Sequence, residues 1–353
     1  MLLLDNDAIA AAITMDMVLA RMRLLYNEIG QGISVSTPRA DLYHRRRSPT
    51  GDGEASVHYL KTMSGGYQGG GVAALRLSSD LVRRSLVDGE IRNIKEEVRP
   101  GRWVGLVLLF SLDTGEPLGI LHDGFLQRLR VGATSALADD HLARSDAARI
   151  GIIGSGAQAR AHLEATALIR QVRQVRVWSP NSGRRHDFAV EMAGRIDADV
   201  IPVDSAEAAT TDADIVMTAT NSRTAVVTDS AIRPGMHVST LNRYELPETA
   251  YNALDHVVVH THSFESSANA EVLPGADDAH YSAASLQRFP TLADLVAGRA
   301  PGRTRADEST GFVNNLGLGS QFAAIGELAV TACRAQGLGR ELDTELFLED
   351  LHP

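Results

Sequence analysis

The chain has 353 residues, of which 44% are hydrophobic and 22% charged, and its formal net charge is −10. This length suits two domains, and the composition is that of an ordinary globular protein. The negative charge and the lack of a basic stripe argue against a nucleic-acid partner, and no apolar run is long enough to span a bilayer. The single cysteine, Cys333, fits a reducing compartment, so we expect a cytoplasmic protein.

The N-terminal part predicts a mixed α+β domain. Apolar spacing predicts a helix over 15–29, and short strands are expected over 58–63 and 72–77. The stretch 41–54, rich in Arg, Ser, Pro and Gly, is interpreted as an exposed loop. The stretch 64–71 carries several glycines and is interpreted as a mobile turn or lid.

Two strongly apolar stretches follow, over 104–112 and 117–122, on either side of the turn sequence Asp-Thr-Gly-Glu. This pattern predicts a β-hairpin. The hairpin has more apolar surface than the core of one small domain needs, so we expect part of it to form the interface of a homodimer. A helix is predicted over 131–144, directly before the next strand.

A glycine cluster after an apolar run is the feature around which the chain is organised. The sequence Gly-Ser-Gly-Ala-Gln-Ala begins at Gly154, and an alanine-rich helical stretch follows at once. Gly154 permits a tight turn, Gly156 lets backbone N–H groups approach a pyrophosphate, and Ala159 allows helix and strand to pack closely. The pyrophosphate of a dinucleotide would lie at the positive end of the helix dipole, against Gly154, Gly156, Ala157 and Gln158.

Helical segments alternate with further strands after the glycine cluster. The predicted strands cover 174–179, 199–203, 213–220, 237–241 and 256–260. Such alternation predicts an α/β protein with a Rossmann-type, doubly wound parallel sheet. The stretch 263–289 is irregular, 292–297 is helical, and Gly311 to Asn315 precede a last helix over 320–336.

The last helix is rich in small residues, and we expect it to return to the first domain. The substrate-binding and dimerisation domain is then discontinuous, over 1–132 and 315–353. The Rossmann domain is predicted over 133–314.

The second predicted strand ends without an acidic residue. An acidic side chain at this place accepts hydrogen bonds from the ribose of NAD, whereas hydroxyl or basic side chains accommodate the 2′-phosphate of NADP. Ser179, Ser182 and Arg184 are therefore predicted near that phosphate, with NADP(H) preferred and NAD(H) as the alternative. Thr220 and Asn221, after the fourth strand, are further candidate cofactor-binding residues.

Three stretches of the chain resemble the ornithine cyclodeaminase/mu-crystallin family. Residues 126–138 resemble the family's Arg-Thr-x-Ala-x-Ser-Ala-Leu-Ala helix start, with Val131 in place of threonine. Residues 154–159 match its glycine loop, and 292–303 resemble the segment before the return to the first domain. The resemblance implies a two-domain dimer that binds NAD or NADP. It also implies an amino or imino acid between the domains, bound by arginines and a lysine.

Arg130 and Arg39 match the arginines that bind the substrate in this family. A guanidinium suits bidentate capture of a carboxylate, although a surface arginine near a helix start and an ordinary loop arginine are the alternatives. Arg76 stands where the family has a lysine, and it can bind or stabilise charge but does not release a proton. Lys61, in the neighbouring strand, is the candidate for the missing amine, or else an exposed strand lysine.

A second departure from the family follows the predicted strand 237–241. Asn242 and Tyr244 stand where the resemblance implies a glycine and a catalytic aspartate. Glu245 is then the candidate catalytic carboxylate, unless the reaction needs none. His237 is interpreted as a structural residue, and the closely spaced histidines further on lack a carboxylate cluster, so no metal site is expected.

These observations predict an NAD(P)-dependent oxidoreductase that interconverts an imino acid, or an oxo acid plus an amine, and an amino acid. One alternative is an ornithine- or lysine-type cyclodeaminase, and another is a binding protein without turnover. Cyclodeamination needs proton transfers as well as hydride transfer. The residues at Arg76 and Tyr244 are poorly suited to that proton transfer, which favours the reductase.

Overall fold

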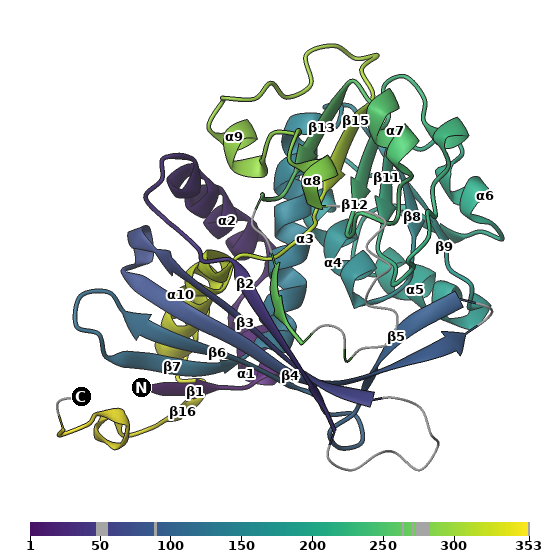
Figure 1. Ribbon diagram of the computed structural model, residues 1–353. Helices are drawn as coiled ribbons and strands as arrows, with labels where there is room; N and C mark the ends of the chain where they lie inside the picture. Colours follow the sequence, from purple (N-terminus) through teal and green to yellow (C-terminus); the bar gives the residue numbers. More distant parts are fainter. Residues whose placement is uncertain (47–55, 88–89, 263–264, 270–271, 273–282, 352–353) are drawn as a thin grey trace.

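The computed structural model describes residues 1–46, 56–87, 90–262, 265–269, 272 and 283–351. Two β-sheets form the framework, and a long central helix lies between them (Figure 1). One sheet is parallel throughout and the other is mixed. The predicted α/β class with a Rossmann-type parallel sheet is confirmed.

The parallel sheet has seven strands within the described residues, in the order β10-β9-β8-β11-β12-β15-β13. The strands are β8 (Arg149–Ile153), β9 (Gln174–Trp178), β10 (Asp199–Pro202), β11 (Ile215–Thr218), β12 (His237–Thr240), β13 (His256–Val259) and β15 (Thr310–Val313). The associated helices are α4 (Ala157–Ala167), α5 (Ser182–Ala193), α6 (Ala206–Thr210) and α7 (Glu248–Ala253). Helices cover both faces of this sheet, which is why β8 and β11 are continuous apolar runs.

One strand of the parallel sheet was not expected. The stretch before the last helix was predicted only as a lead-in, but Thr310 to Val313 form β15, which inserts between β12 and β13. Thr310 pairs with His237 on one side and with His256 on the other. The sequence Thr-Gly-Phe-Val is too short to show a periodic pattern, so this strand depends on its two neighbours.

The mixed sheet has nine strands within the described residues, in the order β14-β2-β3-β4-β6-β7-β1-β16, with β5 paired to β4. The strands are β1 (Leu2–Leu4), β2 (Arg39–Arg45), β3 (Ser56–Tyr67), β4 (Val72–Val87), β5 (Glu90–Glu96), β6 (Val104–Ser111), β7 (Pro117–His122), β14 (Glu265–Ala268) and β16 (Arg340–Glu341). The predicted hairpin is present as the antiparallel pair β6 and β7.

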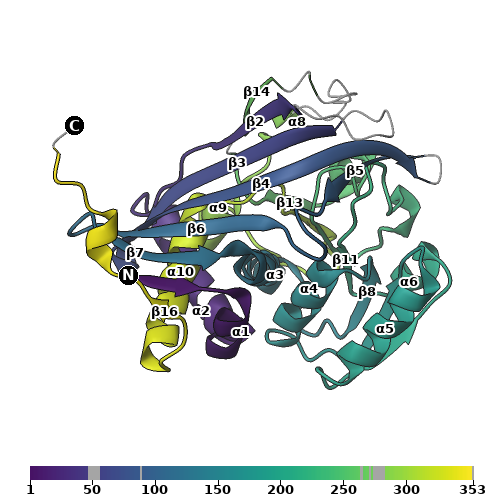
Figure 2. The same cartoon turned by 90° about the horizontal axis from the view of Figure 1, so that it is seen from below.

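Four helices lie on one face of the mixed sheet (Figure 2). They are α1 (Asn6–Ala12), α2 (Met15–Gly30), α3 (Asp123–Leu142) and α10 (Gly319–Ala335). The remaining helices are the short α8 (Ala283–Leu286), α9 (Leu292–Val296) and the 3-10 turns η1 (Gln68–Gly70), η2 (Asp229–Ala231) and η4 (Thr344–Phe347). No described helix is both long and apolar enough to cross a membrane.

The glycines over 64–71 have a packing role instead of the predicted mobile turn or lid. β3 continues to Tyr67, and η1 follows it. A Cβ on Gly65 would lie 2.2 Å from the backbone nitrogen of Ser320, and a Cβ on Gly319 would lie 2.1 Å from the carbonyl carbon of Ser64. These glycines therefore let the start of α10 lie directly on the backbone of β3.

Three other expectations are corrected. The predicted loop over 41–54 begins as strand β2, which runs to Arg45, and residues 47–55 lie outside the described residues. The helix predicted over 131–144 begins at Asp123, eight residues earlier. The stretch 263–289 contains β14 and α8, while 263–264, 270–271 and 273–282 lie outside the described residues.

The discontinuous arrangement of the chain is visible in two contacts. Helix α10 packs on β3, β4 and β6, and β16 pairs with β1, so the C-terminal part lies on the first sheet. The chain also crosses over a second time, because β14 pairs in parallel with β2. Helix α3 runs through the predicted boundary at 132/133. The exact domain boundaries stay a prediction.

Candidate active site

The loop between β8 and α4 has the shape that a dinucleotide pyrophosphate requires. Gly154 has a φ of +114°, and a Cβ there would lie 2.3 Å from the carbonyl oxygen of Ala219, so the position demands glycine. A Cβ on Gly156 would meet nothing within 4 Å, and both Gly156 and Ala157 are exposed. Gln158 keeps a buried side-chain oxygen without a hydrogen-bond partner in the described part of the chain. This open helix start fits the pyrophosphate of NAD or NADP.

The end of β9 carries hydroxyl groups and a free cation. The hydroxyl of Ser179 is 2.8 Å from the hydroxyl of Ser155 in the glycine loop. Ser182 and Arg184 are exposed in the first turn of α5, and the guanidinium of Arg184 has no ion pair with a described residue. Arg185, by contrast, donates a hydrogen bond to the carbonyl of Ser179 at 3.0 Å. The residues predicted for a 2′-phosphate are thus together beside the glycine loop.

Glu245 is fully buried, and hydrogen bonds surround its carboxylate. It accepts bonds from the hydroxyl of Thr218 at 2.8 Å and from both the N–H and the hydroxyl of Thr220 at 2.7 Å. The N–H groups of Leu241 and Asn242 donate at 2.9 and 3.1 Å to Oε2, the oxygen that Thr218 also contacts, whereas Thr220 contacts Oε1. Burial raises the pKa of Glu245, and these donors act in the opposite direction. The carboxylate therefore joins the ends of β11 and β12.

The residues around Glu245 are also engaged in contacts within the protein. Thr220 uses its backbone and side chain on Glu245, while Asn221 is exposed. Tyr244 accepts a hydrogen bond from Arg243 at 3.0 Å, and the guanidinium of Arg223 lies 5.4 Å from its ring centre. Because both carboxylate oxygens of Glu245 accept hydrogen bonds from the protein, we do not include Glu245 among the proposed catalytic residues.

The strands β2, β3 and β4 place three predicted basic residues on one face of the mixed sheet. The register pairs Asp41 with Lys61 and Lys61 with Ser78, so these side chains share a face. Each basic residue has its own carboxylate. Arg39 donates to Asp41 at 2.7 and 2.9 Å, Lys61 lies 3.1 Å from Asp80, and Arg76 lies 2.6 Å from Asp123.

Arg130 projects to the same place from α3. It is 4% exposed, so nearly its whole side chain is buried. The guanidinium groups of Arg130 and Arg76 lie 5.3 and 5.6 Å from the ring centre of Phe322 on α10, so the two cations meet at one ring. Burial, followed by the charge of Arg76, lowers the pKa of Arg130 to about 9. This pair of guanidinium groups can hold a carboxylate.

The sequence had indicated that Arg130 lies at a helix start, and the structure corrects this. Helix α3 begins at Asp123, so Arg130 lies in its third turn. Its buried position has a different origin. A Cβ on Gly317 would lie 2.7 Å from the Arg130 guanidinium, so the glycine before α10 makes the space in which the side chain lies.

Lys61 is buried and not an exposed strand lysine, because only 16% of its side chain is accessible. Burial lowers its pKa to about 8, the charge of Lys95 acts in the same direction, and Asp80 opposes both. Lys95 lies 3.0 Å from the same oxygen of Asp80. A buried amine with a pKa near neutrality is suited to proton transfer.

Several residues at this site were missed by the sequence analysis. Gln127 and Gln321 both bond to Arg130, Asp123 pairs with Arg76, and Phe322 contacts both arginines. Gln321 and Phe322 come from the last helix, whose apolar pattern gives only a packing signal. Asp123 did carry a signal, since it directly follows an apolar strand.

The histidines of the parallel sheet make structural contacts. His237 is fully buried and lies 3.0 Å from Asp139 and 2.9 Å from the hydroxyl of Thr310. His260 contacts Tyr26 and the carbonyl of Leu316, and burial lowers its pKa to about 3. Within the described ranges, no group of three or more His, Cys, Asp or Glu side chains is placed to hold a metal ion.

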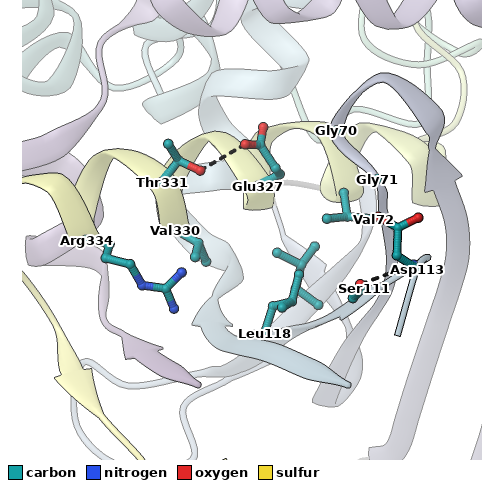
Figure 3. A pocket seen from close by; sticks show the side chains of 11 residues that line it. Gly70, Gly71, Val72, Ser111, Asp113, Leu118, Glu327, Val330, Thr331 and Arg334 are labelled. Carbon is teal, nitrogen blue, oxygen red and sulfur yellow. Dashed lines mark hydrogen bonds between the residues drawn. The ribbon is translucent and has the colours of Figure 1, made fainter. Parts of the chain in front are cut away.

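A cavity of about 270 Å³ lies at the other end of the mixed sheet (Figure 3). Its wall is formed by the start of β4, the β6–β7 turn and the last two turns of α10, and the hydroxyl of Thr331 donates to Glu327 beside it at 2.9 Å. None of the predicted site residues lines this cavity. It is therefore separate from the candidate active site.

Known proteins with this architecture include amino-acid and imino-acid oxidoreductases. The NAD(P)H-dependent anabolic L-arginine dehydrogenase of Pseudomonas aeruginosa is 30% identical over 62% of this chain and 68% of its own length. The Thermococcus litoralis Δ1-pyrroline-2-carboxylate reductase, solved with NADH and L-proline, is 25% identical with a TM-score of 0.77, covering 97% of this chain and 100% of that chain. An archaeal alanine dehydrogenase dimer with bound NAD has the same fold, with 21% identity, a TM-score of 0.75 and coverage of 97% and 98%.

The family model of the ornithine cyclodeaminase/mu-crystallin family matches residues 85–324. This match extends from the end of β4 to the first turns of α10, and it includes the glycine loop and Arg130. The expectation of an NAD(P)-dependent oxidoreductase is confirmed with it. The chain belongs to the ornithine cyclodeaminase/mu-crystallin family.

Proposed function

We propose that this chain is an NADPH-dependent imine reductase, which converts an imino acid, or an oxo acid plus an amine, to an amino acid or runs the reverse reaction. The observation that carries the proposal is the buried guanidinium of Arg130. It lies beside Arg76 and has no carboxylate partner within the described residues. A carboxylate-bearing substrate supplies the missing negative charge.

The proposed roles follow from the contacts. Arg130 binds the substrate carboxylate, and Arg76, held by Asp123, adds positive charge beside it. Lys61 is the proposed proton donor to the substrate nitrogen, and Arg39 lines the same face of the sheet. Bound NADPH would supply the hydride, held at Gly154, Gly156, Ala157 and Gln158. Positioning of the imine carbon is the main task left to the protein.

A cyclodeaminase is the second candidate, because the family includes such enzymes. It must expel ammonia between two hydride transfers, which adds proton transfers at the site. The position of the expected aspartate holds Tyr244, and Glu245 is already occupied by five hydrogen bonds. Both observations favour the reductase.

The first prediction concerns stoichiometry and Arg130. The wild-type chain should oxidise one NADPH per amino acid formed when imino acids, or oxo acids with amines, are screened. Arg130→Ala should lose roughly 2 to 4 kcal/mol of transition-state binding in kcat/KM, the scale of a broken charge-assisted pair. Arg130→Lys keeps the charge without the fork and should lose less. Ammonia release from ornithine or lysine with catalytic NAD⁺, and no net change in cofactor absorbance, would instead establish the cyclodeaminase.

The second prediction concerns pH and Lys61. Because its pKa is about 8, Lys61 is a proton donor below that pH and loses the proton as the pH rises, so kcat should fall through about pH 8. Lys61→Met should abolish this limb and lower kcat. Lys95→Met removes the neighbouring positive charge, which raises the pKa of Lys61, and should move the limb to higher pH. A pH profile of Lys61→Met identical to wild type would remove Lys61 from the proposed mechanism.

The third prediction concerns the cofactor. Ser179, Ser182 and Arg184 favour a 2′-phosphate, so NADPH should bind more tightly than NADH in a fluorescence titration at moderate salt. Arg184→Ala should weaken NADPH binding by roughly tenfold, about 1.4 kcal/mol, and leave NADH binding unchanged. Arg173→Ala, exposed at the opposite end of β9, is the matched control. Equal binding of the two cofactors by the wild-type chain would count against the preference.

The fourth prediction is a homodimer. Helices cover one face of the mixed sheet, while Leu75, Leu106, Leu108 and Ile120 point to the other face of β4, β6 and β7 and are only half-buried. Such an apolar face favours a second copy of the chain. Light scattering at micromolar concentration should give twice the chain mass of 37.8 kDa.

Leu108→Arg should convert the dimer to a monomer, because it places a charge in the centre of this face. Leu168→Arg, at an exposed leucine after α4, is the control and should stay dimeric. A monomeric wild-type chain would refute the interface.

A further inference from the structure

The basic residues of the candidate site differ in the partners that hold them. Arg39, Lys61 and Arg76 are each paired with an aspartate within the described chain. Arg130 is held by two neutral amide oxygens instead, those of Gln127 and Gln321. Since a buried cation without a counter-ion is costly, this arrangement needs an explanation.

The orientation of the Gln321 amide is fixed by its other contacts. The hydroxyl of Thr134 donates its single proton to the carbonyl of Arg130 at 2.7 Å, so it can only accept a further bond. The Gln321 Nε2 atom therefore donates to Thr134 at 2.7 Å, and also to the hydroxyl of Tyr26 at 3.2 Å. Its Oε1 atom must then face Arg130, 3.1 Å from Nη1, and the N–H of Leu318 at 3.0 Å.

Gln127 holds the other edge of the same guanidinium. It lies one turn before Arg130 on α3, and its Oε1 atom accepts from Nε at 3.2 Å and from Nη2 at 2.8 Å. A glutamate has the same length and would form a bidentate ion pair at this position. The two glutamines thus fix the direction of the guanidinium without forming an ion pair, and Asp123, which pairs with Arg76, favours the charged form of Arg130 only through its charge.

We propose that Gln127 and Gln321 are positioning residues that keep the charge of Arg130 available for the substrate carboxylate. The inference rests on the proposed function, since it names how that site selects an anionic group. In the substrate-free protein, Arg130 is buried without an ion-pair partner among the described residues, and carboxylate binding supplies one. Ligand binding then gains from an interaction that the protein does not satisfy by itself.

Gln127→Glu and Gln127→Met test the inference. Gln127 is only half-buried, so both variants should fold. The glutamate should pair with Arg130, raise the Tm of the substrate-free chain and raise KM for the imino acid at least tenfold. Methionine removes the hydrogen bonds but adds no charge, so it should lower the Tm and raise KM less. The probes are Δ1-pyrroline-2-carboxylate, and pyruvate with ammonium.

Gln127→Glu should leave NADPH binding unchanged. Gln171→Glu, at an exposed position between α4 and β9, adds the same charge elsewhere and should match wild type. A merely structural role predicts that methionine at position 127 is at least as harmful to KM as glutamate, and this result would overturn the inference. An unchanged or lowered Tm of Gln127→Glu would overturn it as well.

The proposed reductase activity and the proposed role of Gln127 can be tested separately. If the wild-type chain turns over neither probe nor any other imino acid, the proposed function is refuted. A gain in the stability of Gln127→Glu would then still show that Arg130 lacks an ion-pair partner in the wild-type chain. If the wild-type chain is active and Gln127→Glu keeps the wild-type KM, the proposed role of Gln127 is refuted while the proposed reductase function stands.

Discussion

The burial of Arg130, whose guanidinium has no direct ion pair among the described residues, is the constraint on which the site depends. Arg130 lies on the helix that runs between the two sheets, and α10 returns from the end of the chain to enclose it. The close backbone contact of Gly319 with β3 and the space left at Gly317 bring that returning helix near enough. Without this return, Phe322 and Gln321 would not reach Arg130. The discontinuous chain path thus brings Phe322 and Gln321 to the proposed carboxylate-binding arginine.

The cofactor side and the substrate side are built by different means. The glycine loop uses backbone geometry: Gly154 makes the turn and Gly156 leaves the helix start open. The mixed sheet uses side chains, with basic residues from neighbouring strands on one face, most of them paired with aspartates. Helix α3 connects the two, because it packs against α4 of the glycine loop and also carries Arg130. Hydride transfer between a dinucleotide and an imine needs such fixed positions more than it needs proton exchange.

Much of the fold could be predicted because the signals were local. The glycine loop, the alternating strands and the β6–β7 hairpin each show their own pattern within a few residues. Strand β15 and the role of Gly65 could not be predicted, because both depend on segments far away in the chain. Arg76, Arg130 and Lys61 were predicted as site residues from residue type and resemblance, and the structure places their charges near one another. Gln127 and Gln321 were not, since a neutral amide in a helix has no meaning until the guanidinium it holds is known. Glu245 illustrates the opposite error: a carboxylate in a suggestive place proved to be bonded on all sides.

In the proposed reaction, a hydride passes from NADPH to the carbon of an imine whose carboxylate is held at Arg130. The most direct measurement uses NADPH deuterated at the transferring position of the nicotinamide, followed by mass spectrometry of the amino acid product. Hydride transfer to the imine carbon should place one deuterium at the α-carbon for each NADPH oxidised. An unlabelled product, or product formed without consumption of NADPH, would contradict it.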